Sequence, residues 1–363
     1  MVATAETVTI EKLVYGGEGL TRVAGRVVLT PFVLPGERVQ VERTDNVHAR
    51  LVHVDEASPA RVDPPCPYFG ECGGCDYQHA PYAYQLEQKV AILHEVMQRI
   101  GKFPAPEQIE VISGPEWEYR NRVQLHHNNG RIGYLAARSH RLVDITHCPI
   151  SSPRINQEIA KLRAQRLPRS VRTIEVFTNE TDTGLLDYSA AGYSFRVSPG
   201  SFFQVNRFLV DALVNAVVTG ASSALDLYAG VGLFTIPLGA CCDRVTAVES
   251  GASAAADLRF NASRAEVPVE VVQSDVDDYM ASLETAPELL VADPPRAGLG
   301  KVVTQHIVRL KPPRVHVVAC DPATLARDLA VLLASGYRID RMLLVDLFPQ
   351  TYHMETVVQL SAS

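Results

Sequence analysis

A cysteine stands where a parallel strand is expected to end. The run Val315–Ala319 is largely apolar and β-branched, and Cys320 and Asp321-Pro322 follow it directly. An apolar run closed by a polar residue and a proline predicts a buried strand. In open α/β sheets, ligands bind beyond the carboxyl ends of the strands. The Cys320 thiol is therefore a candidate nucleophile, although a small core cysteine would give the same local pattern.

A glycine-rich turn lies upstream of this cysteine. Asp226–Phe234 has the pattern of a strand, a turn with Gly230 and Gly232, and the start of a helix. The two glycines let the backbone turn tightly and approach a ligand closely. The third glycine of the dinucleotide fingerprint is missing, so this spacing alone is weak evidence for a nucleotide.

Carboxylates close the strands that follow this turn. Glu249 is expected at the end of the second strand, Asp275 after the third and Asp293 after the fourth. A carboxylate after the second strand can bind two ribose hydroxyls, whereas this acidic edge would repel the pyrophosphate of NAD. We therefore expect the cationic cofactor S-adenosylmethionine. The alternative interpretation is that these carboxylates cap the helices that follow them.

Two further segments complete a candidate catalytic site. Asp293-Pro294-Pro295-Arg296 follows the fourth strand, and Glu355 lies within Phe348–Thr356. A thiolate can add to C6 of uracil, which makes C5 nucleophilic enough to attack a sulfonium methyl group. A base must then remove the C5 proton so that the thiol is eliminated. We predict Glu355 as this base, with Asp293 supporting it or orienting the methyl group; His353 is the competing candidate.

A cysteine cluster lies in the first half of the chain. Its members are Cys66, Cys72, Cys75 and Cys148. Four thiolates fit either a structural zinc ion or an iron–sulfur cluster. Zinc sites usually use paired Cys-x2-Cys elements, and the single pair present here favours iron and sulfur. Cys241 and Cys242 are interpreted as packing residues.

The pattern along the chain predicts three domains. Residues 1–58 hold short β-rich stretches between Gly and Pro turns, as in an oligonucleotide-binding β-barrel. Residues 59–198 begin with a Pro-rich break and combine a helical stretch over 81–100 with short strands. Residues 199–363 alternate strands and helices, which predicts an α/β domain with a doubly wound parallel sheet. Its strands are expected at 224–228, 244–249, 269–273, 289–293, 315–320 and 341–346.

The bulk composition excludes several classes of protein. A formal charge of −7 argues against a generic polyanion binder. One basic run, from Lys161 through Arg163, Arg166 and Arg169 to Arg172, is either a solvated helix face or a patch that contacts phosphates. Neither a signal peptide nor a membrane-spanning stretch is evident, and the seven cysteines are not expected to form disulfides. We expect a cytoplasmic monomer.

These motifs together resemble those of the RNA 5-methyluridine methyltransferases, which methylate uracil C5 in rRNA and tRNA. The resemblance covers nearly the whole chain and is carried by Ser198–Asn206, the 226–232 turn, Asp293–Arg296, Ala319–Pro322 and His353–Thr356. It implies a class I S-adenosylmethionine-dependent methyltransferase domain and an N-terminal TRAM domain, an RNA-binding barrel. It also implies that Cys320 is the nucleophile and Glu355 the base. The cofactor contacts that it implies are Gln204, Tyr228, Glu249, Asp275 and Asp293.

The resemblance bears on the cysteine cluster as well. A subset of these enzymes carries a 4Fe–4S cluster at matching positions, with a role apart from methyl transfer. Two positions depart from the family pattern. Leu233 stands where some members have a polar cofactor contact, and Ala319 stands where many have serine. Neither departure removes a catalytic group, so they bear on cofactor affinity and subfamily.

The expected partner is RNA. A uridine in folded RNA must leave its stack before a thiol can reach C6. Candidate stacking side chains are Phe202, Phe203 and Tyr352, and candidate phosphate contacts are Arg120, Arg122, Arg131 and the basic run. Two other functions stay open: methylation of cytosine C5, whose enzymes usually carry Pro-Cys motifs, and a non-catalytic iron–sulfur RNA-binding factor. The complete set of catalytic and cofactor residues argues against the second.

Overall fold

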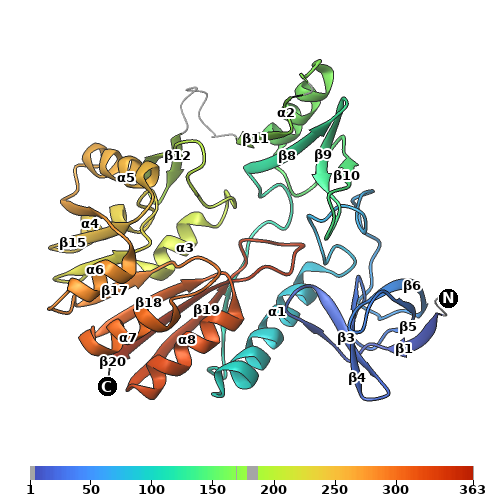
Figure 1. Ribbon diagram of the computed structural model, residues 1–363, viewed down its shortest axis with the longest axis horizontal. Helices are drawn as coiled ribbons and strands as arrows, with labels where there is room; N and C mark the ends of the chain where they lie inside the picture. Colours follow the sequence, from blue (N-terminus) through green and yellow to red (C-terminus); the bar gives the residue numbers. More distant parts are fainter. Residues whose placement is uncertain (1–4, 169, 178–186, 363) are drawn as a thin grey trace. The chain divides into compact units, whose positions relative to one another are not determined.

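The computed structural model (Figure 1) describes residues 5–168, 170–177 and 187–362. The chain forms two compact units, each built from separate stretches of sequence. Unit 1 consists of Met1–Ile92, Pro115–Thr178 and Phe348–His353. Unit 2 consists of Leu93–Gly114, Asn179–Leu347 and Met354–Ser363. The three domains expected from the sequence, 1–58, 59–198 and 199–363, stay a prediction.

Unit 1 begins with six short strands. They are β1 (Glu6–Thr9), β2 (Lys12–Val14), β3 (Glu18–Val23), β4 (Arg26–Pro31), β5 (Arg38–Arg43) and β6 (Ala49–Glu56). They form two antiparallel three-stranded sheets, in the orders β1-β5-β6 and β2-β3-β4. Val28, Val39 and Val41 are buried in a common core, as expected for strands that alternate inward and outward side chains. This arrangement agrees with the predicted barrel-like β module.

The sequence Gly16-Gly17-Glu18-Gly19 is typical of a turn, yet strand β3 already begins at Glu18. Gly19 lies inside the strand, paired with Thr30. A Cβ atom at this position would lie 2.4 Å from Cγ2 of Val33. The glycine therefore marks a close approach of the backbone to a packed side chain rather than the end of a strand.

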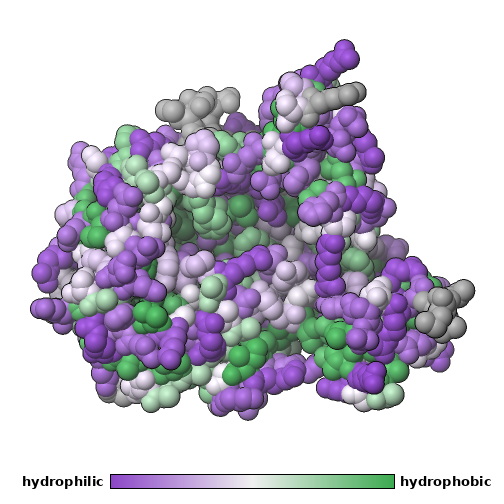
Figure 2. Space-filling model, viewed as in Figure 1, coloured by the Kyte–Doolittle hydropathy of each residue, from purple (hydrophilic) through white to green (hydrophobic). Residues whose placement is uncertain are grey.

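A second sheet completes unit 1. Its strands and helix are β8 (Arg122–Asn128), β9 (Arg131–Leu135), β10 (Leu142–Asp144), β11 (Thr173–Phe177) and α2 (Pro153–Ala164). The antiparallel sheet has the order β10-β9-β8-β11, and α2 packs on it through Ile155 and Ile159. The helix starts at Pro153 because Ser152 caps it and the proline fits its first turn. The outer surface of α2 is hydrophilic (Figure 2).

Unit 2 is built on a mixed sheet with the order β16-β15-β14-β17-β18-β20-β19-β7. Its strands are β7 (Glu110–Ile112), β14 (Ala224–Leu227), β15 (Val245–Glu249), β16 (Val269–Gln273), β17 (Leu289–Ala292), β18 (Arg314–Ala319), β19 (Tyr337–Val345) and β20 (Glu355–Ala362). The other elements are the hairpin β12 (Asp187–Ala190) and β13 (Tyr193–Arg196), and the helices α1 (Tyr82–Val96, continuing as a π-helical turn over Met97–Gly101), α3 (Val210–Val217), α4 (Thr235–Cys241), α5 (Ala252–Arg264), α6 (Val276–Ser282), α7 (Gly300–Leu310) and α8 (Pro322–Ala334). Most of α1, residues 82–92, belongs to unit 1, and only its last turn and the π-helical turn belong to unit 2.

The predicted α/β fold is confirmed, and the six strands expected from the sequence run parallel to one another; the sheet also contains β20, which was not predicted. Strand β20 runs antiparallel to both of its neighbours, β18 and β19. Nine residues, 346–354, separate β19 from β20. A parallel return needs a crossover of about a dozen residues or more, so this connection is too short for one. In the described ranges, no helix has both the length and the apolar character needed to cross a bilayer.

The strand register brings several predicted site residues to one edge of the sheet. Leu227 pairs with Ala292 across the parallel strands β14 and β17, and Ala292 pairs with Val317 of β18. Across the antiparallel pair of β18 and β20, Ala319 pairs with Thr356. The residues next to these pairs therefore share that edge. They are Tyr228, Asp293, Cys320 and Glu355.

The two glycines of the 230–232 turn are expected to respond differently to alanine. At Gly232 φ is +101°, and a Cβ would lie 2.5 Å from Cδ1 of Leu258, whereas Gly230 has φ +56° and no atom within 4 Å of its would-be Cβ. The Gly230→Ala substitution should therefore lower the free energy of unfolding by about 1 kcal/mol, the strain of a left-handed alanine. Gly232→Ala should cost about 1–3 kcal/mol more because it also overpacks the core. Denaturant unfolding of both variants measures this, and equal losses would contradict it.

Candidate active site

The Cys320 thiol lies between the end of β18 and the start of α8. Asp321 caps this helix, since its carboxylate accepts hydrogen bonds from the N–H groups of Ala323 (2.9 Å) and Thr324 (3.0 Å). Pro322 occupies the first turn, where its missing N–H is tolerated. The Asp-Pro sequence thus ends the strand and starts the helix, which leaves the half-buried Cys320 at the junction.

Two carboxyl groups lie at the same edge as this thiol. Glu355 is the first residue of β20 and is only 3% exposed. Burial, and then the negative charge of Asp293, raise the pKa of Glu355 well above its ordinary value. Burial, followed by the charge of Asp226, raises the pKa of Asp293 to about 7. Both carboxyl groups therefore ionise less readily than exposed ones do.

The thiol responds to the same surroundings. Burial raises the pKa of Cys320 to about 11, and the negative charges of Glu355 and Asp293 contribute to this rise, while the Arg296 guanidinium opposes it. At neutral pH the free protein therefore holds Cys320 as a thiol. The structure brings together Cys320, Glu355 and Asp293, the three residues predicted to be catalytic.

The glycine-rich turn is held by Glu249. One oxygen of this carboxylate accepts a hydrogen bond from the N–H of Gly230 (2.8 Å), and the other accepts one from the N–H of Gly251 (2.6 Å). Tyr228, at φ +60°, adopts a left-handed conformation that is uncommon outside glycine. At the end of β14, Asp226 is buried and accepts a hydrogen bond from the Thr235 hydroxyl. The turn thus has a fixed shape before any ligand binds.

The remaining predicted cofactor residues differ in exposure. Gln204 is buried, whereas Asp275 is exposed. Asp275 occupies the N-cap position of α6, but its side chain makes no capping hydrogen bond. The helix-capping alternative is therefore not realised at Asp275.

Sequence reasoning missed two buried residues of α5. The carboxylate of Asp257 accepts hydrogen bonds from the backbone N–H (2.6 Å) and the hydroxyl (3.0 Å) of Ser198. The side chain of Asn261 accepts a hydrogen bond from the backbone N–H of Arg196 (2.8 Å). Asn261 also donates to the carbonyl of Val231 in the glycine-rich turn (2.9 Å). Their spacing of four residues on the buried face of a helix is a signal that the sequence did contain.

The aromatic candidates for RNA stacking separate into two kinds. Phe202 is 68% exposed. Phe203 is buried and stacks on Tyr188 with ring centroids 4.8 Å apart, so it has a packing role. Tyr352 is half-buried and meets the ring of Tyr15 edge-on at 5.5 Å.

Several of the basic candidates are paired within the protein. Arg122 forms an ion pair with Glu175 (2.6 Å), Lys161 forms one with Glu158 (2.6 Å), and Arg163 pairs with Asp144. Arg131 and Arg166 are exposed, Arg172 donates to the side chain of Asn128 (3.4 Å), and Arg169 lies outside the described residues.

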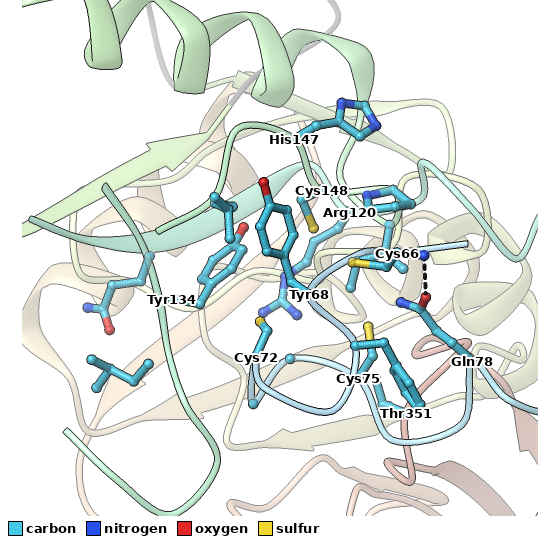
Figure 3. A pocket seen from close by; sticks show the side chains of 18 of the residues that line it. Cys66, Tyr68, Cys72, Cys75, Gln78, Arg120, Tyr134, His147, Cys148 and Thr351 are labelled. Carbon is cyan, nitrogen blue, oxygen red and sulfur yellow. Dashed lines mark hydrogen bonds between the residues drawn. The ribbon is translucent and has the colours of Figure 1, made fainter. Parts of the chain in front are cut away.

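The four cysteines of the cluster surround one cavity of about 330 Å³ within unit 1 (Figure 3). Other residues that line it include Arg120, Tyr134, His147 and His353. The pKa of Cys72 is raised to about 11, first by burial and then by the negative charges of the Cys148 and Cys66 thiolates. Among the described residues, no three His, Cys, Asp or Glu side chains are grouped closely enough to hold a metal ion. The sulfurs thus face a shared space but do not converge on a single point.

The charges around Cys320 predict its reactivity. A thiol with a pKa of about 11 should react with iodoacetamide about tenfold faster for each unit of pH between 8 and 10, because only the thiolate reacts. Glu355→Gln removes a negative charge that raises this pKa, so Cys320 should react faster at each pH. Peptide mass spectrometry measures the modified fraction, with the exposed Cys241 as an internal control that should not change. An unchanged Cys320 rate in the variant would contradict this account.

Comparisons with known proteins agree with this geometry. The model of the tRNA (uracil-5-)-methyltransferase family matches residues 167–363. An uncharacterized RNA methyltransferase of Aquifex aeolicus is 33% identical, with 97% of each chain covered. The 23S rRNA (uracil(1939)-C(5))-methyltransferase RlmD of Halomonas elongata is 31% identical over 97% of this chain and 88% of its own.

A solved structure supports the fold. The Pyrococcus abyssi tRNA (uracil-54, C5)-methyltransferase, in complex with S-adenosyl-L-homocysteine, superposes with a TM-score of 0.75. It is 24% identical and covers 98% of this chain and 100% of its own. These matches confirm the predicted class of enzyme, an RNA uracil-C5 methyltransferase, and support neither the cytosine-C5 nor the non-catalytic alternative. The chain belongs to the tRNA (uracil-5-)-methyltransferase family.

Proposed function

We propose that this chain methylates C5 of a uridine in folded RNA, with S-adenosylmethionine as donor and 5-methyluridine as product. The main support is the register of the sheet edge. The thiol that directly follows β18 lies next to a carboxyl group at the start of β20, and the third candidate, Asp293, directly follows the neighbouring strand β17. A nucleophile and a base on neighbouring strands are what addition to and elimination from a pyrimidine ring require.

Cys320 would act first. Its thiolate would add to C6 of the uracil, which places electron density on C5. C5 would then take the methyl group of S-adenosylmethionine, whose sulfur–methyl bond breaks, and S-adenosylhomocysteine would leave. Glu355 then takes the proton from C5, the bond between C6 and sulfur breaks, and the thiolate is restored. The reaction releases one proton overall, carried away from Glu355. Arg296, whose charge lowers the pKa of Cys320, would stabilise the thiolate.

Glu355 suits the role of base better than His353 does. A carboxylate with a raised pKa is a stronger base than an exposed one, which favours removal of a carbon-bound proton once the group is ionised. The His353 ring instead lines the cysteine cavity and packs on Tyr352 with centroids 4.2 Å apart.

The 226–232 turn and the strand ends beside it would hold the cofactor. A Cβ at Gly230 would meet no atom within 4 Å, so the backbone there borders open space. Each oxygen of Glu249 accepts one backbone hydrogen bond and keeps a lone pair for a ribose hydroxyl. We assign cofactor contacts to Gln204, Tyr228, Gly230, Gly232, Glu249, Asp275 and Asp293.

We further propose that the cysteine cavity holds a 4Fe–4S cluster. Four thiolates around one zinc ion, at about 2.3 Å from the metal, would lie about 3.8 Å from one another and leave no space between them. The four cysteines here border a cavity of about 330 Å³, which favours a larger group. The donor set is all thiolate, as iron–sulfur clusters require. Zinc is the alternative.

The RNA is expected to be ribosomal. The relatives that span this whole chain at 31–32% identity include enzymes named for 23S rRNA, and their coverage includes the N-terminal β module. We propose that this module, residues 1–58, is an RNA-binding TRAM domain. Phe202, exposed on unit 2, is the best placed of the candidate stacking residues. A cytoplasmic location and a monomeric state stay predictions.

Adduct trapping tests the proposed function. RNA containing 5-fluorouridine should become covalently attached to the protein in the presence of S-adenosylmethionine, because fluorine blocks removal of the C5 substituent. Cys320→Ala should abolish both the adduct and methyl transfer to normal RNA. Glu355→Gln should lower turnover by about 10²–10⁴-fold, the usual contribution of a general base, and accumulate an adduct with normal RNA. Methyl transfer by the Cys320→Ala variant would overturn the mechanism.

Anaerobic purification tests the cluster. The protein should be brown and contain iron, and Cys75→Ser should lose both the colour and the iron. Cys241→Ser is the matched control, because Cys241 is exposed and does not line the cavity. A colourless protein that contains zinc would favour the alternative.

A further inference from the structure

The segment Phe348–His353, which precedes the strand of Glu355, is bound to the rest of unit 1 along much of its length. Its backbone binds three side chains: Lys89 Nζ, which donates to one carbonyl at 3.1 Å, the hydroxyl of Tyr119, which donates to the next at 3.0 Å, and the carboxylate of Asp76, which accepts from an N–H at 3.2 Å. Lys89 and Tyr119 are fully buried. These contacts hold this part of the loop between β19 and β20 along a defined path on unit 1.

Gln350 is the centre of this arrangement, because all its polar groups are used. Its carbonyl accepts hydrogen bonds from the N–H groups of Asp76 (2.9 Å) and Tyr77 (3.0 Å). Its backbone N–H donates to Oε1 of Gln85 (3.0 Å), and its Oε1 accepts from Nε2 of Gln85 (2.9 Å). Its Nε2 donates to Glu116 (2.9 Å). The side chain is 1% exposed, so breaking one bond leaves a buried polar group unsatisfied.

The backbone of Gln350 is also strained. Its φ is +67°, a left-handed conformation that costs a residue with a Cβ on the order of 1 kcal/mol. Such strain persists only where the surroundings determine the conformation strongly, and it is commonest at functional sites. A glycine would adopt this conformation freely but would lack the side-chain amide.

We propose that Gln350 is a positioning residue for Glu355. Glu355 opens β20, and the first residue of a strand is the one most prone to fraying. The connection from Val345 to Glu355 has nine residues, and binding Gln350 near its middle removes most of its slack. The inference rests on the proposed role of Glu355 as the base.

This role affects one step of the reaction. Cys320 directly follows β18, which is not part of the 348–353 segment, so we expect thiolate addition and methylation to proceed without Gln350. Removal of the C5 proton should slow, because the base is no longer held in place. Loss of Gln350 should therefore accumulate the covalent adduct, whereas a general loss of folding would lower adduct and product together.

The experiment compares four variants on normal RNA with S-adenosylmethionine. Gln350→Gly removes the amide while relieving the strain, and Gln350→Asn is a milder variant that keeps an amide and tolerates the left-handed backbone. Gln359→Ala is the matched control. Gln359 lies on β20, the strand that Glu355 opens, and its side-chain amide donates to a buried carbonyl, that of Ala216 (2.8 Å), which lies outside the 348–353 segment. Glu355→Gln is the reference for a missing base. The readouts are product release and the fraction of protein in a denaturant-resistant complex with RNA.

We expect both Gln350 variants to accumulate the adduct and to release product at least tenfold more slowly, with the glycine variant more affected, while Gln359→Ala shows neither change. Adduct and product falling in parallel in the Gln350 variants would overturn the inference and leave the role of Glu355 intact. No adduct in Glu355→Gln would overturn both.

Discussion

The pairing of β20 with β18 is the interaction on which the active site depends. It is antiparallel, and Ala319 faces Thr356 across it. Cys320 directly follows Ala319, and Glu355 directly precedes Thr356. Both residues therefore lie at the same end of this strand pair. Because side chains alternate between the two faces of a strand, a slip of one residue would move Glu355 to the opposite face. The proposed chemistry therefore depends on the pairing register of β18 and β20 within the eight-stranded sheet.

Burial sets the charge state of this end of the sheet. The same dry surroundings raise the pKa values of the Cys320 thiol and of the Glu355 and Asp293 carboxyl groups. These shifts reflect the large cost of several uncompensated negative charges in the interior of a protein. Charge then has to develop as the pyrimidine and the sulfonium bind, which couples reactivity to a filled site.

Much of this could be predicted from the sequence, because the relevant signals are local. Apolar runs closed by Asp, Glu or Cys placed the parallel strands and their site residues, and the spacing of the cysteines indicated a shared site. The position of β20 could not be read from its residues, because a buried strand pairs equally well in either direction; the length of the connection before it was the usable clue. The role of Gly19 could not be predicted, because in the sequence a glycine required by close packing looks the same as a glycine required by a turn. The role of Gln350 depends on partners some 230 to 270 residues away in the sequence, which no local pattern reveals.

The strand order also governs when the sheet can be completed as the polypeptide is made. β20 comes later in the chain than both strands between which it lies. Until residues 355–362 have left the ribosome, β18 has an unpaired edge with a row of open backbone groups, and such edges invite association with other chains. Cys320 can thus lie beside Glu355 only after β20 has been synthesised. Before that point, the nascent chain contains the proposed nucleophile without the proposed base.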